Sequence, residues 1–200
     1  MQSRAAVASI LLCVGAAAIA PAQTPSFIFV RGAANSASSM YAAYSLGPAA
    51  LVFGAVINVH NGYREVIGGA VMRVARGENS ALLALTAADA SDSRYLQFYV
   101  VPSLAVHNLS LGGTLETYIP LEDKGTWDLD VNPVTALFPV TAKLRVGPSY
   151  KTSFAPGVIP RHRGGAALKV LIPRGAMTLE WLAGLRRAGG DVRVVLEASF

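Results

Sequence analysis

Twelve charged residues share one face of the predicted strands, and they are the side chains with which this sequence could do chemistry. In an extended strand, successive side chains point to opposite faces, so residues two apart gather on the same face. The charged residues placed together in this way are Glu65, Arg73, Glu116, Asp128, Asp130, Lys143, Arg145, Lys151, Lys169, Glu180, Arg193 and Glu197. If they line an aqueous passage, they select solutes by charge. The alternative, favoured by the equal numbers of acids and bases, is that they neutralise one another inside a filled interior.

The three histidines are the residues to test for catalysis and metal binding. His60 lies at a loop edge, His107 in a turn, and His162 between two arginines in the predicted loop from Ala155 to Arg163. Because none falls on an apolar strand face and the three lie in separate connections, they offer neither a base for a surface nucleophile nor the spacing of a metal site. The chain also lacks GxSxG, Walker, HExxH and dinucleotide-binding motifs. The sequence therefore predicts no catalytic residue, no metal and no cofactor.

Alternation of apolar and polar residues defines the elements that position these side chains. The pattern has a period of two residues, which is typical of strands, and turn signals such as Asn61-Gly62 separate the segments. The predicted strands are 27–34, 39–46, 49–60, 64–75, 80–89, 94–106, 109–121, 125–137, 141–154, 163–172, 176–187 and 191–200. Most have about 10 to 13 residues, near the length that a tilted strand needs to cross a bilayer. We predict an all-β, antiparallel, up-and-down transmembrane β-barrel of about 12 strands, with ten as the alternative because the first two segments are weak.

The last segment, DVRVVLEASF, places Val192, Val194, Leu196, Ala198 and Phe200 on one face and Asp191, Arg193, Glu197 and Ser199 on the other. A strand that ends the chain on an aromatic residue resembles the closing strand of bacterial outer-membrane β-barrels. The resemblance is to a class and not to one family. It implies that the apolar face meets lipid and that the barrel-insertion machinery binds the C-terminal strand. We interpret Trp127, Tyr150, Phe154 and Phe200, near strand ends on the apolar face, as an interfacial aromatic belt, with Phe200 also the assembly signature.

Residues 1 to 22 are predicted to be a signal peptide. Arg4 is followed by an uncharged stretch from Ala5 to Ala20, and Ala20-Pro-Ala22 is a small-x-small cleavage site. The only cysteine, Cys13, lies in this segment, so residues 23 to 200, expected as a single barrel domain, form no disulfide. Beyond residue 22 no apolar run approaches the roughly 18 residues of a transmembrane helix. The mean hydropathy of +0.43 therefore favours apolar residues dispersed along strands.

These features predict an integral outer-membrane β-barrel with a structural role or a narrow passive channel for small hydrophilic solutes, and not an enzyme. The expected partners are outer-membrane lipid and the insertion machinery. The net charge of +5 comes without a basic run, so we expect no nucleic-acid partner. Two alternatives stay open: a soluble periplasmic β-barrel or sandwich that binds apolar ligands, and a lipid-modifying barrel enzyme with a histidine and a serine on its lipid-facing surface. The sequence names neither the solute nor the oligomeric state.

Strand register can also be predicted, because both strands of a hairpin must keep their apolar faces aligned. A hairpin centred near Pro139 places Asp128 opposite Lys151. A hairpin centred on residues 173–175 places Lys169 opposite Glu180. The segment from Ala155 to Arg163 is expected to be the longest external loop.

Overall fold

The computed structural model describes residues 26–46, 49–185 and 189–200, and every regular element in these ranges is a β-strand. The signal peptide predicted for residues 1 to 22 lies outside the described residues. Within them, no helix is long and apolar enough to cross a membrane. The strands are β1 (Phe27–Ala33), β2 (Ser38–Leu46), β3 (Ala49–Asn58), β4 (Tyr63–Arg76), β5 (Asn79–Ala90), β6 (Arg94–Val106), β7 (Leu109–Gly112), β8 (Leu115–Pro120), β9 (Asp128–Pro139), β10 (Leu144–Phe154), β11 (Arg161–Ile172), β12 (Gly175–Leu185) and β13 (Asp191–Ser199).

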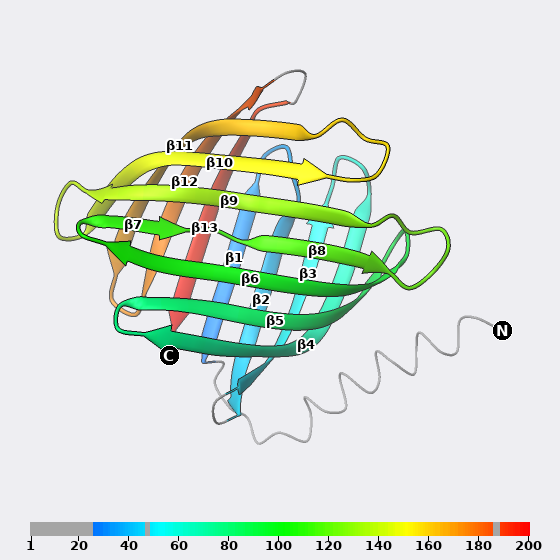
Figure 1. Cartoon of the computed structure of the whole chain (residues 1–200), viewed down its shortest axis with the longest axis horizontal. Helices are drawn as coiled ribbons and strands as arrows, with labels where there is room; N and C mark the ends of the chain where they lie inside the picture. The colour runs from blue at the N-terminus through cyan, green and yellow to red at the C-terminus, as the bar shows by residue number, and fades with distance from the viewer. Residues whose placement is uncertain (1–25, 47–48, 186–188) are drawn as a thin grey trace.

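The strands form one closed antiparallel barrel (Figure 1). Each strand pairs with its neighbours in sequence, and β13 closes the ring by pairing with β1. β7 and β8 lie end to end between β6 and β9, so the thirteen segments occupy twelve positions around the barrel. The prediction of about 12 strands in an up-and-down order is confirmed, and the ten-strand alternative is wrong.

Apolar side chains cover the outside of the barrel and polar side chains fill its inside. On β12 and β13, Trp181 and Val192 are exposed by 60% and 43%, whereas Arg193 is exposed by 1%. Closure of the sheet removes the exposed edges that a flat sheet would present, and it satisfies the backbone hydrogen bonds within the wall. A soluble protein would bury the apolar face, so the observed distribution is the one expected of a wall that faces lipid.

The two ends of the barrel differ in the length of their connections. At the end that holds Phe200, two-residue turns such as His107-Asn108 and Pro173-Arg174 join the strands, and His107 and Arg174 adopt positive φ angles of 54° and 64°. Longer connections occur at the other end (Figure 1). The prediction for the segment from Ala155 to Arg163 is wrong, because residues 161–163 belong to β11 and the connection 121–127 is longer than 155–160. We call this second end the long-loop end.

An irregularity in β9 changes the face that its second half presents. Tyr150 of β10 pairs with Val134, but Thr152 pairs with Val131, so β9 holds one extra residue at Asn132 and Pro133. Proline has no N–H for the ladder and is found at such bulges. The same irregularity interrupts the segment predicted as one strand over 109–121, which divides into β7 and β8.

The bulge also corrects a predicted face. The alternation places Leu137 with Leu129 on the lipid-facing side, but one extra residue inverts the alternation beyond Pro133. Leu137 is consequently buried, while Phe138 is exposed.

Both predicted charge pairs have the wrong register. The turn between β9 and β10 lies at residues 140–143 and not around Pro139, so Lys151 lies opposite the bulge and not opposite Asp128. In the hairpin of β11 and β12, Lys169 pairs with Thr178 and Glu180 pairs with Ala167, because the turn contains only residues 173 and 174. The shift there is two residues, which preserves the predicted faces.

Candidate functional site

The barrel interior collects most of the charged residues predicted for it. The side chains on the inward-facing positions of their strands are Glu65, Arg73, Glu116, Asp128, Asp130, Arg145, Lys151, Lys169, Glu180, Arg193 and Glu197. Arg73 is exposed, and it lies toward the end of β4 that carries the short turns. Lys143 is a correction: it lies exposed in the turn before β10, because the strand begins at Leu144, three residues later than the predicted start at residue 141.

A chain of hydrogen bonds crosses the interior from β13 to β8, and we call it the crossbar, formed by Asp191, Arg193, Asn132 and Glu116. Arg193 donates from Nε to Asp191 Oδ2 at 2.8 Å and from Nη1 to Asn132 Oδ1 at 2.8 Å. Asn132 donates from Nδ2 to Glu116 Oε1 at 3.4 Å. β9 and β13 lie four positions apart around the barrel, so the bond between Arg193 and Asn132 spans the lumen. The sequence placed Asn132 on the polar face, but nothing local in it indicates this partner.

A second polar cluster lies on β4, β5 and β6. Gln97 is fully buried and donates from Nε2 to Glu65 Oε1. Its amide oxygen accepts hydrogen bonds from Thr86 Oγ1 at 2.9 Å and from the Tyr99 hydroxyl at 2.8 Å. Tyr63 donates to the other oxygen of Glu65 at 2.8 Å. The alternation of Tyr95, Gln97 and Tyr99 places these polar side chains on one face and was the sequence signal for this cluster.

Some interior charges form ion pairs, as the neutralisation alternative predicts. Lys151 Nζ lies 3.5 Å from Asp130 Oδ2, and Lys169 Nζ lies 2.9 Å from Glu197 Oε2. Other carboxylates are held by neutral donors: Tyr118 donates to Glu116 Oε2 at 3.0 Å. Among the residues that the structure describes, neither Glu65 nor Glu116 forms a salt bridge. Ion pairing therefore accounts for part of the interior and not for all of it.

The interior charges are unevenly distributed around the barrel. From β4 to β9 the inward-facing charged residues are mostly acids, and from β10 through β13 to β1 they are mostly bases. The first half contains Glu65, Glu116, Asp128 and Asp130 with Arg73, and the second contains Arg31, Arg145, Lys151, Arg161, Arg163, Lys169 and Arg193 with Glu180, Asp191 and Glu197. Opposed charges on two walls create an electric field across the lumen. The crossbar joins the two halves.

A cavity of about 300 Å³ occupies the interior toward the long-loop end. Ser36, Thr126 and Ala155, which lie in connections at that end, contribute to its lining. Deeper in the barrel, it is lined by Arg31, Asn132 and Lys151 and by carboxylates and tyrosines that include Glu116 and Tyr118. The buried atoms Asp128 Oδ1, Asp130 Oδ1 and Arg31 Nε have no hydrogen-bond partner in the described part of the protein. Polar groups in such positions are suited to binding water or a hydrophilic solute.

Metal binding receives no support from this arrangement. Over the described residues, no group of three or more His, Cys, Asp or Glu side chains could hold a metal ion.

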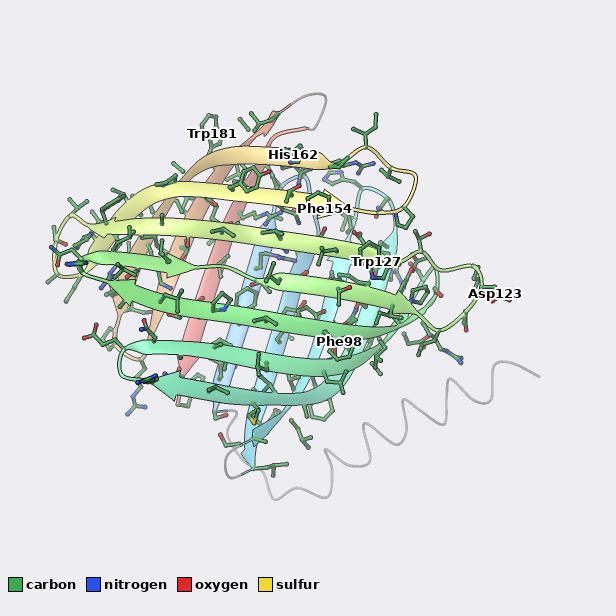
Figure 2. The ribbon with its side chains drawn as sticks, in the orientation of Figure 1. Phe98, Asp123, Trp127, Phe154, His162 and Trp181 are labelled. Atoms are coloured by element: carbon green, nitrogen blue, oxygen red, sulfur yellow. The ribbon has the colours of Figure 1, made fainter. Side chains whose placement is uncertain are left out.

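His162 is a correction to the prediction that no histidine lies on the lipid-facing side. It belongs to β11 and pairs with Thr152, on the outward-facing side near the long-loop end (Figure 2). Its Nδ1 lies 2.7 Å from the Tyr150 hydroxyl and 2.9 Å from Thr152 Oγ1. Both hydroxyls share one ring nitrogen, and Thr152 is only 4% exposed. A buried hydroxyl that competes for its base is poorly placed to attack a lipid ester.

The aromatic residues predicted as an interfacial belt lie at both ends of the barrel. Trp127, Tyr150 and Phe154 lie toward the long-loop end (Figure 2), where the ring centroids of Phe154 and His162 are 6.4 Å apart. Phe200 lies at the opposite end, where its backbone N–H donates to the carbonyl of Ser26 at 3.1 Å. This bond ties the last residue to the start of the first strand.

Comparison with solved structures shows that the fold of the barrel is similar to that of porins. A structure of the KdgM porin matches with a TM-score of 0.60 and 11% sequence identity over 87% of this chain and 99% of the porin. A KdgM porin in complex with disordered oligogalacturonate matches with a TM-score of 0.61 and 11% identity over the same shares of the two chains. The NanC porin matches with a TM-score of 0.55 and 10% identity over 87% of this chain and 98% of the porin. No family model and no curated protein sequence matches the chain.

Proposed function

We propose that this protein is an integral outer-membrane β-barrel that serves as a narrow passive channel for small hydrophilic solutes. The observation that carries the proposal is the distribution of side chains in a closed barrel, with apolar residues outside and a charged, cavity-containing interior. Such a barrel is stable with its outer face in lipid, and its interior can hold water and polar solutes. The similarity in fold to porins supports the same reading.

A soluble periplasmic β-barrel that binds apolar ligands would need an apolar interior to hold them. The buried residues of this barrel include Glu65, Gln97, Glu180 and Arg193, whereas large apolar residues such as Leu179 and Trp181 are exposed. The lipid-modifying alternative requires an accessible nucleophile beside a histidine, and Thr152 is buried beside His162. We therefore infer a channel without enzymatic activity.

Export and assembly are part of the proposal. Residues 1 to 22 are proposed to direct the chain out of the cytoplasm, and the strand ending at Phe200 to be bound by the barrel-insertion machinery. We further propose that Trp127, Tyr150, Phe154 and Phe200 lie at the two membrane interfaces, where aromatic rings are favoured.

Two measurements test the function. An integral barrel stays in the membrane pellet after a urea wash, whereas a soluble or peripheral protein is released. The purified mature protein, reconstituted in a planar bilayer, should then give discrete conductance steps. A folded, membrane-embedded protein without conductance and without solute permeability would contradict the channel.

A further inference from the structure

We propose that the crossbar of Asp191, Arg193, Asn132 and Glu116 is the constriction of the lumen and that it favours small dipolar solutes over ions of either sign. The inference rests on the proposed channel function and specifies the residues and the solute class. It arises from three features of the structure: the path of the hydrogen bonds, the burial of the residues, and the charges on either side of them.

The crossbar narrows the lumen because its central bond, between Arg193 and Asn132, runs across the barrel between two strands that are not neighbours. Arg193 on β13 reaches Asn132 on β9 at 2.8 Å, and Asn132 reaches Glu116 on β8. Arg193 is anchored at its other side by Asp191, which accepts from the backbone N–H of Asn35 at 3.0 Å and from the Ser36 hydroxyl. Asn132 is the last inward-facing residue of β9 before the bulge inverts the alternation beyond Pro133.

The residues of the crossbar are held in place by burial. The exposed fractions of Arg193, Asp191 and Asn132 are 1%, 2% and 3%. A buried, hydrogen-bonded arginine of this kind cannot swing aside without leaving donors and acceptors unpaired. The opening beside the crossbar is therefore fixed in size by its side chains.

The charges around the crossbar oppose ions of both signs. Both signs of charge line the cavity, so that the carboxylates of Glu65, Asp128 and Asp130 repel an anion, and Arg31 and Lys151 repel a cation. A dipolar solute can turn its negative end toward the basic half of the barrel and its positive end toward the acidic half. The cavity, at about 300 Å³, is at the lower end of the range of roughly 300 to 1,000 Å³ that holds small ligands.

The first experiment compares Asn132→Ala with Thr178→Ala in planar bilayers containing KCl. Thr178 is also buried and inward-facing, so its truncation removes a polar lumen side chain without touching the crossbar. We expect Asn132→Ala to raise the single-channel conductance about two-fold or more, since it removes the central group of the constriction. Thr178→Ala should leave the conductance near that of the unmodified protein. Heat-modifiable migration on gels establishes that each variant has folded.

The second experiment tests the solute class. Liposomes holding the unmodified protein should swell readily in glycine, a zwitterion, and the reversal potential in a KCl gradient should lie close to zero. Glu116→Gln keeps an oxygen acceptor for the Asn132 amide and removes one negative charge, so it should shift the reversal potential toward that of chloride.

The possible outcomes distinguish a failure of the crossbar proposal from a failure of the channel proposal. Equal conductance in the unmodified protein, Asn132→Ala and Thr178→Ala would overturn the crossbar and leave the channel in place. Conductance in Asn132→Ala alone would support the crossbar and contradict the channel in the unmodified protein. Silence of all three folded proteins would overturn both, and a strong preference of the unmodified protein for one ion would overturn the solute class.

Discussion

Replacement of Arg193 by methionine should destabilise the barrel through its effect on Asp191. The arginine is buried and forms hydrogen bonds with Asp191 and Asn132, each at 2.8 Å. Methionine fills much of the same volume but provides no charge and no donor. The substitution therefore leaves a buried carboxylate without its cation and the Asn132 oxygen without its partner.

The magnitude follows from the groups that remain around Asp191. Removing one member of a buried ion pair costs about 3 to 5 kcal/mol. Asp191 keeps the backbone N–H of Asn35 and the Ser36 hydroxyl as donors, so we expect a loss near the lower limit. A loss of about 3 kcal/mol corresponds to a change of roughly a hundredfold in the unfolding equilibrium constant.

Urea titration of the protein refolded into liposomes measures this change. The two tryptophans, Trp127 and Trp181, are exposed on the barrel, so their fluorescence reports transfer between lipid and water. The double variant Asp191→Asn with Arg193→Met should recover at least half of the lost stability, because it buries no unpaired charge. A single variant within about 0.5 kcal/mol of the unmodified protein, or a double variant no better than the single, would refute the reasoning.

Three further predictions concern the wall of the barrel. Leu179→Arg, at an exposed position in the middle of β12, should cost about 2 to 4 kcal/mol in the same titration, since it places a charge near the bilayer centre; no loss would argue against a lipid-facing outer surface. Gly165→Ala should lower the refolding yield, because an added Cβ would collide with the carbonyl of Trp181 across the β11–β12 pair. The matched change Gly32→Ala, where a Cβ has open space, should have little effect, and equal yields would contradict the collision. Deletion of Phe200 should reduce the amount of heat-modifiable protein in the outer membrane, and an unchanged amount would remove the assembly role.

The sequence by itself determined the strands and the faces of most of them. In β13, Val192, Val194 and Leu196 point outward and Arg193 points inward, as the alternation predicts. This information is local, because one strand with a period of two residues is enough to separate an apolar face from a polar face. The sequence also predicted that the apolar faces point outward, since strand lengths, the predicted signal peptide and the terminal aromatic residue all favour a lipid environment. The twelve-strand barrel followed from these local patterns.

Only the tertiary structure decided which interior residues meet. A side chain in the lumen contacts strands several positions away around the ring, as Arg193 contacts Asn132, and no local pattern encodes that distance. Turn lengths and bulges also set the register of the paired strands. The turn at residues 140–143 separates Asp128 from Lys151, and the extra residue at Pro133 turns Leu137 inward. The face of each residue is a property of its own strand, whereas its partner across the lumen depends on the geometry of the whole closed sheet.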